Sequence, residues 1–355
     1  MTTTAPPSAD AQLRFLSTLQ RLFAEGSVTA TYKYALLISL ADLAVECGAD
    51  DGGELMLSIR QIAERFIQLY WHQATPYGTG CAGSTSAVLS QSCGTQAAIV
   101  SAIATFRSCV VVSSVQAAQT MPAFQPLLTI VARIVSAQPL NYLQNFGGGT
   151  DEFLYERAGT GRLRLKPGVA YCLRRFQSLA QQLARSYWIG HIKGNHRNHS
   201  ILGQTDDLEE FLFRTSRRSL AVLAAGLRQI DGAVCFYCGG TLGTAAPDVD
   251  HFIAFSQYPR DLAHNFVLAH PRCNRSKSAA LAGRPHLARW LTRLLNASDD
   301  IAAIGVAAGM VADASSSRQI AKWGYTTAMH AGGRAWLAPT HYENVDSDYQ
   351  ALLLA

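Results

Sequence analysis

Two short pairs of metal-binding residues lie between positions 235 and 273 of the chain. Cys235 and Cys238 are separated by two residues, and His270 and Cys273 repeat that spacing 32 residues after Cys238. Each pair can turn both side chains toward one ion, and three thiolates with one imidazole form an ordinary tetrahedral zinc set. Because protein ligands fill all four positions, such a zinc ion would be structural. The residues between the pairs must then fold as a small module around it.

The remaining cysteines form no second pattern of this kind. They are scattered along the chain, at Cys47, Cys81, Cys93, Cys109 and Cys172. This distribution does not fit the disulfide framework of a secreted protein. Residues 1–10 lack the basic and then apolar layout of a signal peptide, and no uncharged apolar run reaches the roughly 18–20 residues that span a bilayer. We therefore expect a cytoplasmic protein without a membrane partner.

The chain is long enough for more than one folded part. Its 355 residues, 48% hydrophobic and 15% charged, are typical of an ordered globular protein. The polar segment Gly194–Ser200 lacks periodicity and indicates a boundary nearby. We predict an α+β protein that is mostly α: a helical N-terminal domain over residues 1–200, the metal-binding module over residues 201–295 and a short helical tail over residues 296–355.

Hydrophobic periodicity predicts the main helices. Thr31–Glu46 repeats apolar residues at a spacing of three to four, which is typical of a helix. Val169–His191 and Asp206–Gln229 are each predicted as one long helix. The strand-like Leu55–Ser58 and the helix from Ile59 allow two interpretations. They resemble part of a winged helix-turn-helix, but an amphipathic helix packed in an α-rich domain is favoured.

The segment between the two metal-binding pairs contains residues suited to hydrolysis. Asp250 and His251 are adjacent, and Asn265 and Asn274 follow them. A histidine ring readily takes up a proton near neutral pH, which suits the activation of water. Carboxylate and amide oxygens are hard ligands suited to Mg²⁺ or Mn²⁺. Asn274 directly follows Cys273, so a zinc site would fix its position.

Basic residues are concentrated around this segment, although the net charge of the whole chain is only +5. Between residues 251 and 293, Asp261 is the only acidic residue. Such an excess favours a nucleic-acid partner. The candidates beside the second pair are Arg272, Arg275 and Lys277. The seven basic residues of the stretch are Arg260, Arg272, Arg275, Lys277, Arg284, Arg289 and Arg293.

The order Cys-x2-Cys, Asp-His, Asn, then Cys-Asn-x-x-Lys resembles the HNH (His-Me finger, ββα-metal) endonuclease family. The offsets of 14 and 23 residues from His251 to the two asparagines are similar to those in the HNH domain of the RNA-guided CRISPR nuclease. The chain departs from the family at two positions. His270 stands where many zinc-bearing members have cysteine, and Asn274 stands where some members have a third histidine.

The resemblance implies a role for each of these residues. His251 would be the general base, and Asp250 and Asn274 would bind the catalytic Mg²⁺ or Mn²⁺. Asn265 would orient the histidine or hold the loop, and Lys277 would approach a phosphate. The implied fold is a zinc-stabilised ββα-metal (HNH) nuclease module appended to the helical domain.

The implied activity is hydrolysis of DNA, with RNA not excluded, in phage defence or restriction. An alternative is a zinc-knuckle nucleic-acid-binding regulatory protein without hydrolysis, which zinc and basic residues would serve equally well. A third interpretation makes residues 1–200 a sensor that keeps the nuclease silent until a companion protein or phage component appears. Pro76–Gly94 and Gly194–Ser200 would then be its candidate hinges.

Overall fold

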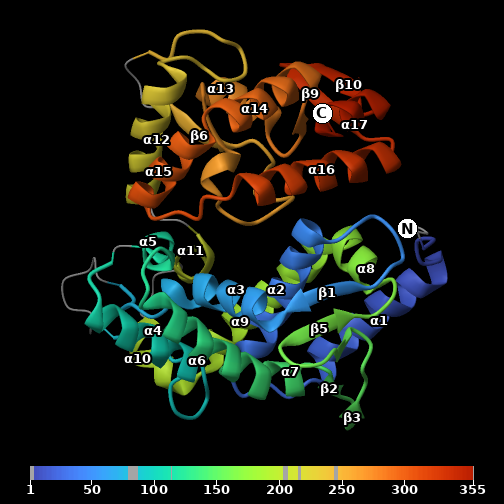
Figure 1. Cartoon of the computed structure of the whole chain (residues 1–355), viewed down its shortest axis with the longest axis vertical. Helices are drawn as coiled ribbons and strands as arrows, with labels where there is room; N and C mark the ends of the chain where they lie inside the picture. Colours follow the sequence, from blue (N-terminus) through green and yellow to red (C-terminus); the bar gives the residue numbers. More distant parts are fainter. Residues whose placement is uncertain are drawn as a thin grey trace. The chain divides into compact units, whose positions relative to one another are not determined.

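The structure, a computed structural model, describes residues 4–78, 87–112, 114–202, 207–214, 217–243 and 247–354. The chain forms two compact units, Met1–Phe213 and Arg214–Ala355 (Figure 1). Both units are mostly helical and contain small sheets. The expected fold class, α+β with mostly helices, is confirmed.

The N-terminal unit is built mainly from helices. Its described helices of four or more residues are α1 (Ala9–Glu25), α2 (Tyr32–Cys47), α3 (Ile59–Trp71), α4 (Ala98–Cys109), α5 (Val115–Gln119), α6 (Phe124–Ala137), α7 (Pro139–Tyr142), α8 (Val169–Arg175), α9 (Gln177–Gly194), α10 (His199–Leu202) and α11 (Leu208–Phe213). Its strands are β1 (Leu55–Ser58), β2 (Asn145–Phe146), β3 (Gly149–Thr150), β4 (Tyr155–Arg157) and β5 (Arg162–Leu165). An antiparallel sheet joins β1, β5 and β4 in that order.

Helix α2 forms the centre of this unit, where it packs against α3, α8 and α9 (Figure 1). Every residue from Tyr32 to Glu46 is buried, as in a helix that neighbours surround on all sides. Two acids of this helix, Asp42 and Glu46, are buried with the rest. Gln181 donates a hydrogen bond of 2.7 Å to Asp42, and Arg65 forms an ion pair with Glu46.

Helix α3 begins with a capping box, because Ser58 and Gln61 bond reciprocally to each other's backbone amides. Its apolar side, which includes Ile62 and Phe66, is fully buried, and α3 packs against α6. This packing supports the interpretation of an amphipathic helix within an α-rich domain.

Two predicted long helices are interrupted. Val169–His191 divides into α8 and α9 at Phe176, whose φ of −112° and ψ of 25° depart from helical geometry. The predicted helix over Asp206–Gln229 is represented by α11 and by α12 (Arg217–Asp231). Asp206 lies outside the described residues, as do residues 79–86 of the predicted Pro76–Gly94 loop.

The polar segment Gly194–Ser200, which the sequence placed near a boundary, is an anchored part of the N-terminal unit. Asn195 and Asn198 are 3% and 0% exposed. The Asn198 amide donates 3.0 Å bonds to the carbonyls of Ser90 and Ile192 and accepts a 2.7 Å bond from the Ser90 amide. The segment therefore holds the chain around residue 90, and the boundary between the units falls later, after Phe213.

The C-terminal unit combines helices with two small sheets. Its described helices are α12, α13 (Pro271–Lys277), α14 (Arg284–Asn296), α15 (Ser298–Ala308), α16 (Ala314–His330) and α17 (Ser347–Leu354). Strands β6 (Asp248–His251) and β7 (Phe266–Ala269) form an antiparallel pair. A second sheet has the order β10 (His341–Asn344), β9 (Arg334–Ala338), β8 (Leu281–Ala282).

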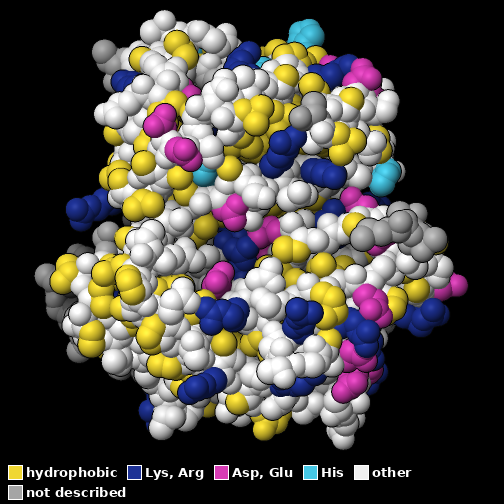
Figure 2. Space-filling model, viewed as in Figure 1, with side chains coloured by type: hydrophobic (Ala, Val, Ile, Leu, Met, Phe, Trp, Pro, Cys, Tyr) yellow, Lys and Arg dark blue, Asp and Glu magenta, His cyan; other side chains and the backbone are white. Residues whose placement is uncertain are grey.

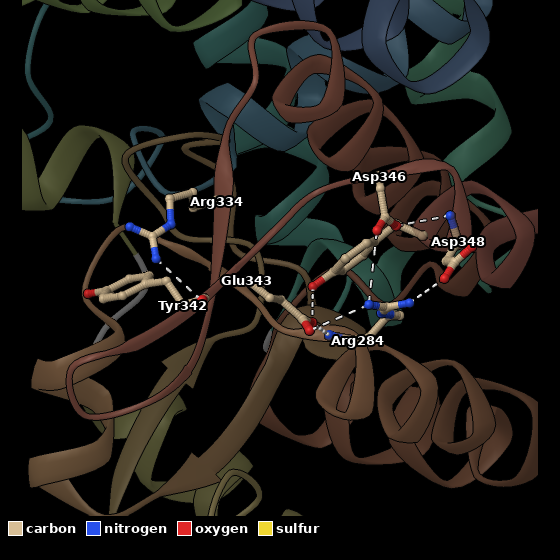
Figure 3. Close-up of polar contacts among 7 residues, drawn as sticks. Arg284, Arg334, Tyr342, Glu343, Asp346 and Asp348 are labelled. Carbon is tan, nitrogen blue, oxygen red and sulfur yellow. Dashed lines mark hydrogen bonds and ion pairs between the residues drawn. The ribbon is translucent and has the colours of Figure 1, made fainter.

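The segment from β9 to α17 belongs to the C-terminal unit and is not a separate tail. Strand β9 pairs in parallel with β8, which begins four residues after the last residue of α13. Arg284 at the start of α14 forms ion pairs with Glu343, Asp346 and Asp348 (Figure 3). These contacts join residues 281–296 to residues 334–354, so the expected segments 201–295 and 296–355 fold as one unit.

Candidate metal centre and adjoining hairpin

The first metal-binding pair lies on a tight turn. Val234 and Thr241 form a β-bridge across its base, and the Cys235 amide donates a 2.8 Å bond to the carbonyl of Gly240. Gly239 has a φ of +68°, a conformation that favours glycine. A side chain at Gly240 would stand 3.5 Å from Cys238 Sγ. Gly239 therefore allows the turn to close, whereas the Gly240 position would tolerate a Cβ at ordinary contact distance.

The four predicted ligands lie together. One donor atom from each of Cys235, Cys238, His270 and Cys273 lies within 4.8 Å of the others. A tetrahedron with metal–sulfur bonds of about 2.3 Å has ligand atoms about 3.8 Å apart. His270 Nδ1 is 3.3 Å from Cys238 Sγ, and its Nε2 is 3.1 Å from the carbonyl of Thr241. The Cys₃His cluster could hold a metal ion such as zinc, with a backbone carbonyl fixing the imidazole from behind.

The thiols of the cluster affect one another's ionisation. Burial and the neighbouring Cys235 raise the pKa of Cys273 to about 12. Burial also opposes ionisation of Cys238, but the Gly240 amide and the His270 ring outweigh it and lower that pKa to about 7. Thiolates crowded in this way are stabilised by a shared cation, which supports the fit of the cluster to zinc.

The β6–β7 hairpin leads into the second half of the cluster. Asp250 pairs with Val267 and His251 with Phe266, while His270 and Cys273 follow at the start of α13. Asn265 closes the far end of the hairpin. Its side chain accepts a 2.8 Å bond from the Ile253 amide and donates a 2.9 Å bond to the Ile253 carbonyl. Asn265 thus fixes the backbone that directly follows His251.

The His251 side chain is held at the end of β6. Its Nε2 is 2.6 Å from Oδ1 of Asp261, and the two side chains are 21% and 13% exposed. The imidazole packs against Phe266 and Phe255, with ring centroids 4.3 Å and 5.4 Å away. When Nε2–H donates to a carboxylate, Nδ1 carries the lone pair. The ring is therefore oriented by a carboxylate that sequence reasoning did not select.

Helix α13 is joined to β6 by two polar contacts. Asn274 donates a 2.9 Å bond to Oδ2 of Asp248, and Lys277 lies 3.1 Å from Oδ2 of Asp250. Residues 248 and 250 share one face of the strand, and residues 274 and 277 lie about one helical turn apart. Tyr237 adds a 2.5 Å bond to the same oxygen of Asp250. The turn, the strand and the helix therefore meet at the Asp250 carboxylate.

Lys277 occupies a different environment from the expected phosphate contact. Its side chain is 0% exposed, and its ammonium also donates a 2.9 Å bond to the His251 carbonyl. Burial lowers the pKa of Lys277, whereas the Asp250 charge raises it. An ammonium enclosed in this way cannot reach a phosphate in solution, so Lys277 serves as the internal partner of Asp250.

Several other basic residues of this stretch hold the unit together. Arg293 binds Asp231 and the Phe266 carbonyl, Arg289 binds the Phe236 carbonyl, and Arg284 binds acids near α17. Arg272 and Arg275 are exposed on α13. On the face in Figure 2, the Lys and Arg side chains of the described residues are dispersed among acidic and apolar ones and form no single basic patch. The basic excess is therefore partly internal.

The predicted site residues fall into two groups. Asp250, Lys277 and Asn274 lie between β6 and α13, whereas His251 follows Asp250 on the strand and is held by Asp261. In the described part of the chain, no hydrogen bond or ion pair links the His251 ring to Asp250 or Asn274. Sequence reasoning missed Asp248, which strand alternation places beside Asp250. It also gave Asp261 no role, although that residue was the one acid in a basic stretch.

Comparison with known proteins concerns the N-terminal unit. A family model described as "Domain of unknown function (DUF8808)" matches residues 12–212, more than half of the 355-residue chain. No protein with curated annotation matches the chain, and no solved structure does. Among the described residues, no helix is long and apolar enough to cross a membrane. The cluster and the hairpin lie outside the matched residues.

Proposed function

The chain belongs to the family described as Domain of unknown function (DUF8808), and since that description carries no activity, we propose a function from the C-terminal unit. It acts as a metal-dependent HNH endonuclease that hydrolyses DNA phosphodiester bonds. The observation that supports this most is the pairing of His251 with Asp261 at the end of a hairpin that Asn265 closes. A Cys₃His cluster, in which Cys235 and Cys273 are buried and Cys238 is exposed, adjoins that hairpin.

His251 takes the proton from the attacking water in this proposal. The Asp261 carboxylate holds Nε2, so Nδ1 is the atom that accepts the proton. Asp261 also stabilises the imidazolium that forms, because the carboxylate lies 2.6 Å from the ring nitrogen. Phe255 and Phe266 limit rotation of the ring by packing against it. Asp261 is thus a positioning residue, and His251 is the group that moves the proton.

Oxygen atoms for a hard divalent ion are present between β6 and α13. Tyr237 and Lys277 occupy Oδ2 of Asp250, and in the described residues its Oδ1 has no hydrogen-bond partner. The side-chain nitrogen of Asn274 donates a hydrogen bond to Asp248. The side-chain oxygen of Asn274 is left to act as a metal ligand. These atoms fit Mg²⁺ or Mn²⁺. When bound there, the ion would stabilise negative charge on the scissile phosphate.

The ion pair between Asp250 and Lys277 supports a second candidate function. A carboxylate that already binds an ammonium and a tyrosine hydroxyl is engaged as a structural anchor, which weakens its capacity to hold a cation. The unit would then bind nucleic acid through exposed side chains such as Arg272 and Arg275 without hydrolysis. His251 would serve only to pack the hairpin in that case.

Plasmid cleavage distinguishes the two functions. The full chain, purified with zinc, is incubated with supercoiled plasmid and Mg²⁺ or Mn²⁺, and nicked and linear products are measured over time. We expect cleavage by the wild type and a loss of about 10²–10⁴-fold in His251→Ala, the usual contribution of a general base. Asp261→Asn should lose less and should shift the pH–rate profile. His330→Ala, an exposed histidine of the same unit, should retain full activity.

To exclude an unsuitable substrate as the cause of inactivity, the assay is repeated on modified DNA and on RNA. It is also repeated in the presence of candidate companion proteins or phage extract. Nucleic-acid binding is measured in parallel by fluorescence anisotropy. Binding without cleavage on every substrate, with His251→Ala binding as well as the wild type, would establish the non-hydrolytic function. Equal cleavage by His251→Ala and the wild type would exclude His251 as the base.

A further inference from the structure

The N-terminal unit contains a cavity of about 820 Å³, a size that accommodates a small organic molecule. Its walls come from the segment after α1, the start of α2, the segment before α4 and the end of α6. Apolar side chains such as Ile134 and Pro139 alternate with hydroxyl groups such as Thr29 and Thr95. The lining includes two cationic side chains, Lys33 and Arg133, and no acidic one.

Lys33 is a buried cation in this wall. The residue is only 8% exposed, and its ammonium donates one 3.1 Å bond, to the carbonyl of Asn145. Among the described residues, no carboxylate forms an ion pair with it. Burial accordingly lowers the pKa of Lys33. A buried ammonium with a single neutral partner is costly, and an anion in the cavity would offset that cost.

Two further features favour an anion at the same place. Arg133 is exposed on α6 and forms no ion pair with a described residue. Helix α4 begins in the cavity wall at Ala98, and the Tyr32 hydroxyl accepts a 3.2 Å bond from the Ile99 amide of its first turn, so the helix start contributes its dipole rather than a free amide at Ile99. The 12-residue helix therefore directs the positive end of its dipole toward the cavity. One helix end alone would not define a site, but here it adds to a cavity and a buried ammonium.

We propose that this cavity binds a small organic phosphate, with the phosphate group between Lys33, Arg133 and the start of α4. The apolar part of the ligand contacts Ile134, Pro139 and the ring of Tyr142. The volume of about 820 Å³ suits a free small molecule. This inference concerns the family domain itself and does not depend on the proposed nuclease activity, because ligand binding is measured without cleavage.

Isothermal titration calorimetry on the full chain tests the proposal. The probes are AMP, glucose 6-phosphate and phenyl phosphate, each compared with its dephosphorylated counterpart. We expect at least one phosphate probe to bind saturably, and its counterpart to bind at least about 10-fold more weakly, since charge-assisted bonds carry the recognition. Lys33→Met keeps the length of the side chain but removes its charge. This variant and Arg133→Gln should each weaken binding about 10-fold.

Lys166→Met is the matched control, because Lys166 belongs to the same unit but not to the cavity wall. It should bind as the wild type does. Arg133 is exposed, so its variant remains informative even if Lys33→Met lowers stability. The proposal is overturned if every phosphate probe fails at millimolar concentration, or if phosphate and counterpart bind equally. It is also overturned if only a 5′-phosphorylated oligonucleotide shows binding that depends on Lys33.

Discussion

Replacing Lys277 by methionine removes the ammonium that pairs with Asp250 while filling nearly the same space. The Lys277 side chain is 0% exposed and that of Asp250 is 10% exposed, so the substitution leaves an enclosed carboxylate with the Tyr237 hydroxyl as its main partner. Breaking a buried ion pair from one side costs about 3–5 kcal/mol. We expect Lys277→Met to lower the free energy of unfolding by about 3 kcal/mol, since Tyr237 retains its bond.

A double-mutant cycle isolates the pair. In Lys277→Met with Asp250→Asn, neither charge remains, and the amide can still accept the Tyr237 bond. The double variant should therefore recover to within about 1–2 kcal/mol of the wild type. Arg275→Met is the control on the same helix, because Arg275 is exposed, and should change stability by less than about 0.5 kcal/mol.

The assay must report on the C-terminal unit, since the chain has two compact units that can unfold separately. Hydrogen exchange of the β6 and β7 amides, followed through a urea titration, gives the free energy of opening for the hairpin itself. A loss below about 1 kcal/mol in Lys277→Met would refute an internal role for the ammonium. If the same variant then bound DNA more weakly, the expected phosphate contact would be supported instead.

Three further predictions concern other parts of the chain. His270→Ala should lose the bound zinc, measured by mass spectrometry of the metal content, and should unfold the C-terminal unit, whereas His251→Ala should keep both zinc and fold. Burial raises the pKa of Asp42 to about 7 from 3.8. The Asp42 carboxyl therefore binds its proton more tightly in the folded chain than in the unfolded chain. For this reason the free energy of unfolding should fall as pH rises from 3.8 to about 7. Asp42→Asn should flatten that slope in urea titrations, and the exposed Asp10→Asn should not. Asn198→Ala leaves buried backbone groups unpaired and should lower stability by about 2–4 kcal/mol in the same titrations; an unchanged midpoint would contradict the anchoring role.

The ligand cluster could be predicted from sequence because its geometry is largely local. A separation of two residues lets both members of each pair face one ion, whatever surrounds them. Helix α2 was also predictable from its apolar spacing, but its complete burial was not. Asp42 and Glu46, one helical turn apart, resemble a solvent-exposed face in the sequence, and their tertiary partners Gln181 and Arg65 keep them inside.

The remaining site contacts join residues that lie far apart in the sequence, and local spacing does not predict such contacts. Lysine is rarely buried, so Lys277 was assigned to a phosphate and its enclosure by Asp250 was missed. Asp261 was visible as an isolated acid, but nothing local pointed to its contact with His251. Asn198 belonged to a polar segment that was interpreted as marking a domain boundary, although its amide bonds to a backbone 108 residues earlier.

Trp336 packs beside the candidate metal centre but is synthesised after all of its ligand residues. Its ring packs edge-on against Tyr237, 5.4 Å between centroids, and its indole donates a 3.1 Å bond to Ser276 of α13, 60 residues earlier. The hairpin and all four cluster residues thus leave the ribosome well before the side chain that packs against Tyr237 and binds Ser276. While that interval lasts, Tyr237 lacks its covering ring. A nascent chain should therefore finish its N-terminal unit first and acquire an ordered centre only once β9 has been made.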